Sequence, residues 1–126
     1  MMNTDKPKIL YVDDEMINLQ LFRYTFEKNY TIVLADSGYD GLEKIKTDTS
    51  ISVVISDLKM PGLNGLEFIK MLKQIRADLP CLLLTGYENT AEIEKAIDSK
   101  LIVANIIKPF NKQDVENCIN TILGGA

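Results

Sequence analysis

Five side chains that could do chemistry each follow a short apolar stretch of the chain. They are three carboxylates, one hydroxyl and one ammonium group: Asp13, Asp14, Asp57, Thr85 and Lys108. Taken singly, each has an ordinary structural explanation, because acids cap helices, threonine forms turns and lysine is usually solvated. Their shared place at the ends of apolar runs indicates one common site if those runs are parallel strands.

The chemistry of this set follows from its charges. Adjacent carboxylates repel one another unless a cation lies among them. Oxygen ligands without His or Cys favour a hard divalent ion, and protein-bound Mg²⁺ usually shares its shell with phosphate oxygens. Lys108 and the Thr85 hydroxyl would then bind the remaining phosphoryl oxygens. Because an aspartate on the metal is a nucleophile toward phosphorus, the set predicts an aspartyl phosphate.

Composition narrows the other possibilities. The 126 residues include 46% hydrophobic and 25% charged side chains, as expected for one folded domain with a core of its own. The chain has no His, which excludes a Ser-His-Asp triad, a Cys-His pair and a His-ligated metal. A net charge of −4 without a basic stripe argues against direct binding of nucleic acid.

The lack of a targeting segment in the sequence and the two cysteines indicate a protein of the cytoplasm. No apolar run approaches the length of a membrane span, and the first residues contain no apolar targeting segment. Cys81 and Cys118 lack the spacing of metal ligands, and we interpret both as reduced packing residues. We therefore expect a cytoplasmic protein that does not bind a membrane.

Strand-like and helix-like patterns alternate along the chain. The apolar runs cover Lys8–Val12, Tyr30–Ala35, Val53–Ile55, Pro80–Leu84 and Leu101–Ile107. Apolar residues at helical spacing follow each run, the first helix beginning near Glu15. The other helices have capping residues with an acid three positions later: Ser37, Asn64, Asn89 and Asn111. This alternation predicts a parallel sheet with helices on both faces, whose shared carboxyl edge would gather the five side chains.

In order and spacing, these motifs resemble the receiver domain of two-component response regulators. The resemblance rests on Asp13-Asp14, Asp57 with Met60-Pro61-Gly62 and Gly65, Thr85, and Lys108-Pro109-Phe110. It implies a flavodoxin-like (βα)5 fold, a three-layer α/β sandwich whose parallel five-stranded sheet has the order 2-1-3-4-5. We expect this domain to cover residues 8–123, with short tails at 1–7 and 124–126.

The same resemblance implies a role for each site residue. Asp57 would be the phosphoacceptor and, with Asp14, a direct ligand of Mg²⁺, for which Mn²⁺ could substitute. Asp13 would act largely through water, and the main-chain carbonyl of Lys59 would complete the protein ligands. The residues that would bind the phosphoryl group are Thr85 and Lys108.

Partners also follow from the resemblance. The phosphoryl donor would be a sensor histidine kinase or a histidine phosphotransfer protein. A downstream protein or a fused output domain would bind the face made by helix four, strand five and helix five. The domain would be a signalling receiver rather than an enzyme, assisting only its own phosphorylation and dephosphorylation. It would be a monomer or a dimer that forms on phosphorylation, either standing alone or belonging to a larger regulator.

Two departures from the family pattern concern the conformational switch. The family usually has an aromatic residue three positions before the strand-five lysine, where this chain has Asn105. The frequent Gly before strand five is also missing from Asp98-Ser99-Lys100. A receiver that serves as an interaction module without phosphorylation is therefore the second hypothesis.

Lys59 and Tyr87, both bulky, predict slow loss of phosphate because they would crowd the attacking water.

Other proteins with related chemistry match the residues less well. A haloacid-dehalogenase-type phosphatase needs a second Asp two positions after the nucleophile, where this chain has Lys59. A flavodoxin-like cofactor carrier needs a Ser/Thr/Gly-rich phosphate loop after the first strand, where Asp13-Asp14-Glu15 would repel a phosphate. Neither GxGxxG nor GxxxxGK(S/T) occurs, which excludes a Rossmann or P-loop nucleotide site.

Overall fold

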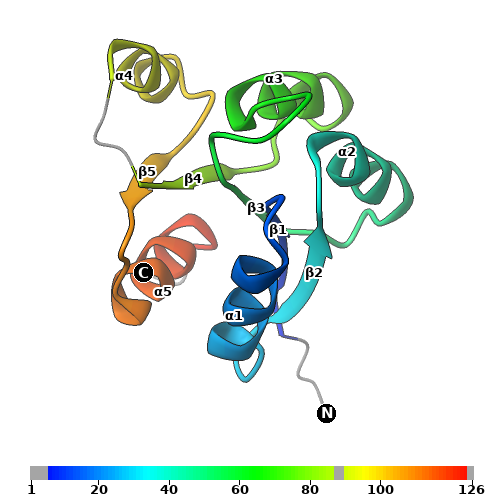
Figure 1. Ribbon diagram of the computed structural model, residues 1–126, viewed down its shortest axis with the longest axis vertical. Coiled ribbons are helices and arrows are strands. Elements are labelled where there is room, and N and C mark those ends of the chain that lie inside the picture. Colours follow the sequence, from blue (N-terminus) through cyan, green and yellow to red (C-terminus); the bar gives the residue numbers. More distant parts are fainter. Residues whose placement is uncertain (1–5, 87–89, 125–126) are drawn as a thin grey trace.

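Strands and helices alternate from one end of the chain to the other in the computed structural model, which describes residues 6–86 and 90–124 (Figure 1). The strands are β1 (Lys8–Val12), β2 (Thr31–Ala35), β3 (Val53–Ser56), β4 (Cys81–Thr85) and β5 (Ala104–Ile107). The helices are α1 (Met16–Phe26), α2 (Gly38–Thr47), α3 (Gly65–Ile75), α4 (Ala91–Asp98) and α5 (Lys112–Ile122). The predicted βα alternation is therefore confirmed.

The strands form one parallel sheet in the order β2-β1-β3-β4-β5. Every residue of β3 and β4 is buried, which explains why these strands are continuous apolar runs rather than alternating ones. Strands buried on both faces need helices above and below the sheet. The predicted α/β flavodoxin-like fold and its strand order are confirmed.

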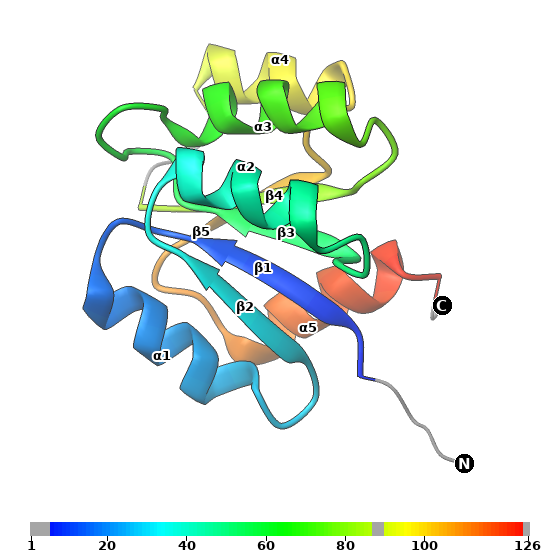
Figure 2. The same cartoon turned by 90° about the vertical axis from the view of Figure 1, so that its right-hand side faces the viewer.

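The helices cover the two faces of the sheet unequally. Helices α1 and α5 lie on one face, and α2, α3 and α4 lie on the other (Figure 2). Each layer has its own core cluster: Phe22, Phe26 and Val115 belong to the first, and Phe68 and Ile93 to the second. The sheet separates these clusters, so a side chain on β1 contacts one layer or the other according to its position along the strand.

Three of the four predicted helix caps have the expected residue. The side chain of Ser37 accepts a hydrogen bond from the Asp40 N–H, and Asn64 forms a full capping box with Glu67. Asn111 caps α5 but accepts from the Gln113 N–H. The fourth prediction was wrong, because Thr90 is the N-cap of α4 and accepts from the Ile93 N–H. Asn89 itself lies outside the described residues.

Strand β5 is shorter than the predicted run Leu101–Ile107, since it begins at Ala104. The N–H groups of Leu101 and Ile102 both donate to the Ala96 carbonyl, so these residues complete the turn after α4 rather than joining the sheet. Ile102 is nevertheless buried in the core. An apolar run marks residues that pack inside, and only the hydrogen bonds decide which of them are strand.

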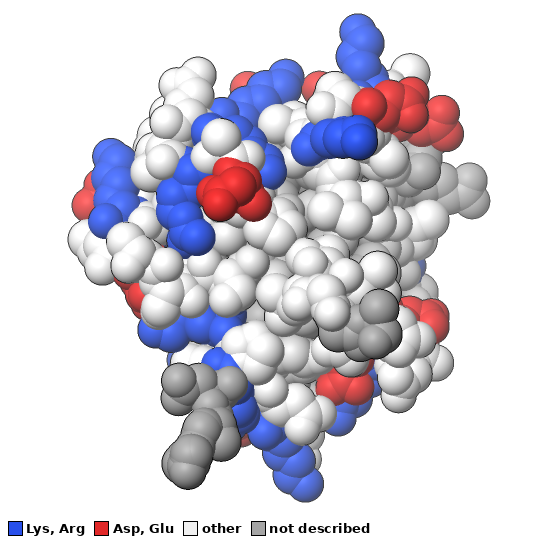
Figure 3. Space-filling view, turned by 180° about the vertical axis from the view of Figure 1, so that it is seen from behind, with Lys and Arg blue, Asp and Glu red and all other residues white. Residues whose placement is uncertain are grey.

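Charges on the surface are mixed. On the face that Figure 3 shows, uncharged residues fill the middle, and Asp and Glu interrupt the groups of Lys and Arg around them. This face thus presents no continuous basic band of the kind that binds a nucleic acid backbone. Among residues 6–86 and 90–124, no helix has the length and apolarity that a membrane span requires.

At Gly65 the first turn of α3 lies against the main chain that follows β3. A methyl group there would overlap the Asp57 carbonyl oxygen and lie 3.1 Å from Leu58 Cα. We expect Gly65→Ala to lower the free energy of unfolding in urea by roughly 1–3 kcal/mol, the usual cost of extra atoms in a packed region. Gly86→Ala is the matched control, because its methyl group would meet nothing within 4 Å. Equal losses in both variants would contradict the steric argument.

Candidate functional site at the carboxyl edge of the sheet

Main-chain pairing brings the predicted residues to one edge. Val12 pairs with Ser56, and the Asp57 N–H donates to the Val12 carbonyl at 2.9 Å, so the residues after β1 and β3 are neighbours. On the other side of β3, the Lys108 N–H donates to the Thr85 carbonyl at 2.6 Å. The expected convergence of the strand ends follows from this register.

Three carboxylates form a cluster at this edge. Asp13, Asp14 and Asp57 each offer an oxygen atom, and these oxygens lie within 4.8 Å of one another. Asp13 is buried, Asp57 is partly buried and Asp14 is exposed, so the cluster opens to solvent on the Asp14 side. The donors are all oxygen, the ligand type that Mg²⁺ prefers. This cluster fits a hard divalent cation.

Asp13 is held from three directions. Its Oδ2 accepts a hydrogen bond from the Tyr11 hydroxyl at 2.7 Å, and its Oδ1 accepts from the Glu15 N–H at 3.0 Å. Lys108 Nζ lies 3.7 Å from the same Oδ2. Burial raises the pKa of the Tyr11 phenol and the Asp13 carboxylate raises it further, so the hydroxyl keeps its proton and remains a donor.

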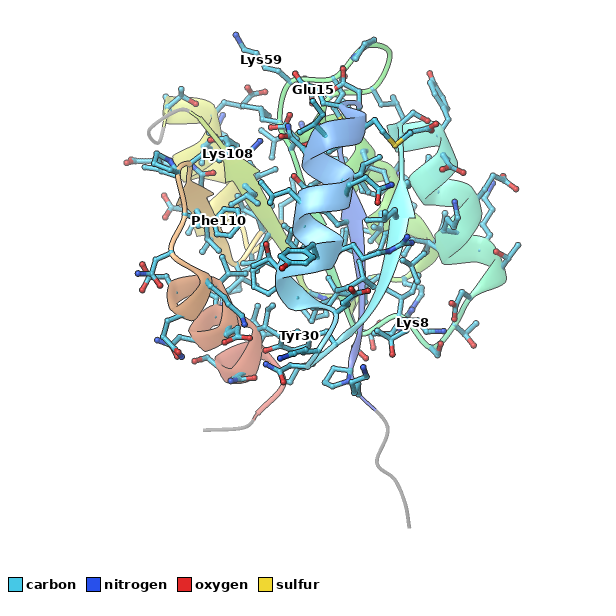
Figure 4. The ribbon with its side chains drawn as sticks, turned by 60° about the horizontal axis from the view of Figure 1, so that its bottom comes forward. Lys8, Glu15, Tyr30, Lys59, Lys108 and Phe110 are labelled. Atoms are coloured by element: carbon cyan, nitrogen blue, oxygen red, sulfur yellow. The ribbon has the colours of Figure 1, made fainter. Side chains whose placement is uncertain are left out.

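Lys108 supplies positive charge between two of the carboxylates. Its Nζ lies 3.7 Å from Asp13 Oδ2 and 3.7 Å from Asp57 Oδ1. Both separations are ion pairs rather than short hydrogen bonds, and the side chain is 28% exposed. In Figure 4, Lys108 lies at the same end of the molecule as Glu15, the residue that follows the Asp13-Asp14 pair. The lysine therefore faces the cluster at ion-pair distance from two of its carboxylates.

Asp57 is oriented by its own loop. Its Oδ1 accepts from the Leu58 N–H at 2.9 Å, and the Leu58 carbonyl accepts from the Gly65 N–H at 2.7 Å. Burial raises the pKa of the Asp57 carboxyl above its ordinary value; Lys108 opposes this shift and the charge of Asp13 adds to it. A cation at the cluster would favour the ionised form of Asp57 and so oppose this rise in its pKa.

Thr85 and Asn105 are linked across neighbouring strands. Thr85 is fully buried at the end of β4, and its hydroxyl donates to Asn105 Oδ1 at 3.3 Å. Asn105 stands on β5, paired with Leu83, at the position where the family usually has an aromatic residue. The chain therefore connects its threonine to β5 by a polar contact.

The structure does not support the prediction that the Lys59 and Tyr87 side chains crowd the site. Lys59 is exposed, and Figure 4 shows its side chain extending outward from the loop after β3. Tyr87 lies outside the described residues. The slow loss of phosphate expected from these two residues therefore stays a prediction.

Tyr11 is the residue that sequence reasoning missed. It lies inside the apolar run Lys8–Val12, which predicts a strand but assigns no role to its phenol. The sequence feature that could have identified Tyr11 is its spacing to Asp13, because residues two apart on an extended chain share a face. That placement lets the phenol reach the carboxylate.

The fold and this edge define the class of protein: a flavodoxin-like α/β domain with a cluster of three carboxylates, able to hold a divalent cation, beside a lysine. Residues 9–120 match the family described as the response regulator receiver domain. The chain belongs to this family, and it is a receiver domain of two-component response regulators.

Relatives of the chain include short and long proteins. It is 32% identical over 125 residues to the chemotaxis protein CheY1 of Helicobacter pylori, covering 93% of this chain and 97% of that protein. It is 31% identical to the alkaline phosphatase synthesis transcriptional regulatory protein PhoP of Bacillus subtilis, covering 92% of this chain. The chain spans only 48% of the length of PhoP. Activities of such longer proteins therefore do not follow from this match.

Solved structures agree in fold. A receiver domain protein from Clostridium thermocellum superposes with a TM-score of 0.88 at 30% identity, covering 94% of each chain. The response regulator TrrA of Thermotoga maritima, solved in complex with Mg²⁺ and BeF, superposes with a TM-score of 0.79 at 27% identity. That match covers 92% of this chain and 98% of TrrA. Receiver domains bind Mg²⁺ at an acidic pocket, and this chain has the corresponding acidic cluster.

The raised pKa of Asp57 predicts a pH-dependent stability in the absence of metal. Because the folded-state pKa lies above the unfolded one, stability present at low pH is lost as pH rises through the folded-state value. In a chelating buffer we expect Asp57→Asn to melt above the wild type at about pH 7, and the difference to shrink toward about pH 4. Asp78→Asn, at an exposed carboxylate before β4, is the control. A melting-temperature difference between Asp57→Asn and the wild type that does not change with pH would show that the raised pKa of Asp57 is not the cause.

Proposed function

We propose that this chain is a phosphorylation-regulated signalling receiver whose Asp57 accepts a phosphoryl group. The observation that carries the proposal is the position of Lys108, whose Nζ lies 3.7 Å from both Asp13 and Asp57 within the three-carboxylate cluster. The donor is a sensor histidine kinase or a histidine phosphotransfer protein. Receiver domains of two-component systems work with histidine kinases and output domains, and the finer identity of the donor is part of the proposal.

The metal in this proposal is Mg²⁺. The Asp14 and Asp57 carboxylates and the main-chain carbonyl of Lys59 bind it directly, and Asp13 binds it largely through water. When bound, the ion supplies positive charge for the phosphoryl oxygens. Mn²⁺ substitutes, because carboxylate, carbonyl and water ligands suit both ions. The support for this ligand set is the cluster of carboxylate oxygens within 4.8 Å of one another.

The chemical step is a displacement at phosphorus. An Asp57 carboxylate oxygen attacks, a new P–O bond forms, and the bond to the donor nitrogen or oxygen breaks with its electron pair leaving on the donor. The Leu58 N–H, which donates to Asp57 Oδ1 at 2.9 Å, holds the nucleophile in orientation. The chain thereby assists its own phosphorylation and dephosphorylation and acts on no separate substrate.

Lys108 and Thr85 then bind the new phosphoryl group. Lys108 needs only a small movement, because its Nζ lies 3.7 Å from Asp57 Oδ1. The Thr85 hydroxyl exchanges Asn105 for a phosphoryl oxygen, a difference in contacts between two states that can shift their populations. Since Asn105 stands on β5, this exchange reaches the outermost strand on that side of the sheet.

The output surface in this proposal is the α4–β5–α5 face. Ile107 of β5 is 43% exposed, and Val103 just before β5 is 50% exposed, so apolar side chains are available there for a partner. A downstream protein or a fused output domain binds this face. The domain acts in the cytoplasm as a monomer or as a dimer that forms on phosphorylation.

Phosphorylation is tested with acetyl phosphate, a small acyl phosphate. In the presence of Mg²⁺ we expect the intact mass to increase by one phosphoryl group that is stable to acid and labile to base. Chelation should prevent the increase, and Mn²⁺ should restore it. Asp57→Asn should remove it, whereas Asp78→Asn, at an exposed carboxylate away from the cluster, should not. The same increase on Asp57→Asn would show that the acceptor is wrongly assigned.

Amide hydrogen exchange tests the output surface. We compare the Mg²⁺-loaded protein with and without beryllofluoride, which occupies the place of a phosphoryl group. Protection should change in α4, β5 and the start of α5, because the contact between Thr85 and Asn105 joins the end of β4 to β5, which is part of this face. Asn105→Ala should reduce the change. A response confined to α1 and α2 would place the output elsewhere.

A further inference from the structure

We propose that Tyr11 is a positioning residue of the acidic site: its hydroxyl holds the Asp13 carboxylate toward Asp14 and Asp57 and so strengthens divalent-cation binding. The inference rests on the metal role proposed above for the three carboxylates. It adds a residue from inside the sheet that touches the carboxylate without being a ligand. The supporting observations are the burial of Asp13, the burial and stacking of the Tyr11 ring, and the oxygen atom that Tyr11 shares with Lys108.

Asp13 needs fixed donors because it is wholly buried. Its side chain is 0% exposed, whereas Asp14 is open to solvent. A buried carboxylate is costly unless its oxygens accept hydrogen bonds. The Glu15 N–H satisfies Oδ1 at 3.0 Å, and the Tyr11 hydroxyl satisfies Oδ2 at 2.7 Å. One donor on each oxygen determines both the position and the rotation of the carboxylate plane.

The donor itself cannot move far. Tyr11 is 2% exposed on β1, between β2 and β3, and its ring is stacked on Phe22 with centroids 4.1 Å apart and an interplanar angle of 7°. Phe22 in turn contacts Phe26, with centroids 4.6 Å apart. The hydroxyl is therefore placed by the packing between the sheet and α1, not by the site it serves.

Tyr11 and Lys108 meet on the same oxygen of Asp13. The phenol makes the short contact at 2.7 Å, and the ammonium remains at 3.7 Å from Oδ2. Asp13 therefore keeps a hydrogen bond on this oxygen when Lys108 moves toward a group on Asp57. Without the hydroxyl, Lys108 would be the remaining donor near Oδ2 among the contacts described for Asp13, and a lysine drawn onto that oxygen would compete with a bound cation.

Calorimetric titration with Mg²⁺ tests the inference directly. Tyr11→Phe keeps the ring and removes only the hydroxyl, and we expect the Mg²⁺ dissociation constant to rise roughly tenfold, the lower end of the usual loss for a hydrogen bond behind a metal ligand. Tyr30→Phe is the matched control, because Tyr30 belongs to the same core cluster but its hydroxyl donates to Asn120. Tyr30 also lies at the opposite end of the molecule from Lys108 (Figure 4). Its substitution should leave Mg²⁺ affinity unchanged.

A double-mutant cycle separates positioning from packing. If Tyr11 acts through Asp13, then Tyr11→Phe should have little effect on Mg²⁺ affinity in an Asp13→Asn background. An equal loss in both backgrounds, or no loss in the wild-type background, overturns the inference. The rise in melting temperature over a Mg²⁺ series gives the same comparison where the heat signal is weak.

The readout is metal binding, so it separates this inference from the proposed function. A wild type that binds Mg²⁺ but takes up no phosphoryl group overturns the proposed function alone. Normal phosphorylation together with unchanged Mg²⁺ affinity in Tyr11→Phe overturns the role of Tyr11 alone. A wild type that binds no Mg²⁺ overturns the metal role on which the inference rests.

Discussion

Three carboxylates held at one edge of the sheet repel one another, and the groups around them are arranged to limit that repulsion. Asp13, Asp14 and Asp57 bring their oxygens within 4.8 Å of one another, and Asp13 does so while wholly buried. Burial raises the pKa of the Asp57 carboxyl and the charge of Asp13 adds to that shift, so holding these ionised groups together opposes folding. Lys108 offsets part of it from 3.7 Å, too far for a short hydrogen bond. A divalent cation among the three carboxylates would offset the repulsion that remains.

The parallel sheet makes this concentration of charge possible. Because all strands run in the same direction, their carboxyl ends meet at one edge, where the loops rather than the packed strand interiors carry the polar groups. The interior supplies the stability that the edge lacks, since β3 and β4 are buried along their whole length and the helices close both faces. Register then brings residues distant in the chain together: Asp57 donates its N–H to Val12, and Lys108 donates its N–H to Thr85.

Two polar contacts connect the site to the layers around it. The Tyr11 hydroxyl joins Asp13 to an aromatic row formed by Phe22, Phe26 and Phe110, which links α1 to the loop that carries Lys108. The Thr85 hydroxyl joins the end of β4 to Asn105 on β5. The first contact is set in rigid packing and suits positioning. The second is a hydrogen bond of 3.3 Å between neutral groups and suits exchange, because a charged phosphoryl oxygen is the stronger acceptor.

Sequence patterns alone predict the βα alternation, the fold class and the polar residues at the carboxyl edge of the sheet. These features depend on local patterns: apolar runs of strand length, capping residues, and polar groups directly after the runs. The tertiary structure decided the start of β5, the cap at Thr90, and the contacts of Tyr11 with Asp13 and of Thr85 with Asn105. An apolar run does not reveal which of its residues pair in the sheet and which only pack against it. Likewise, a hydroxyl finds its acceptor only when register and packing have placed both side chains on the same face.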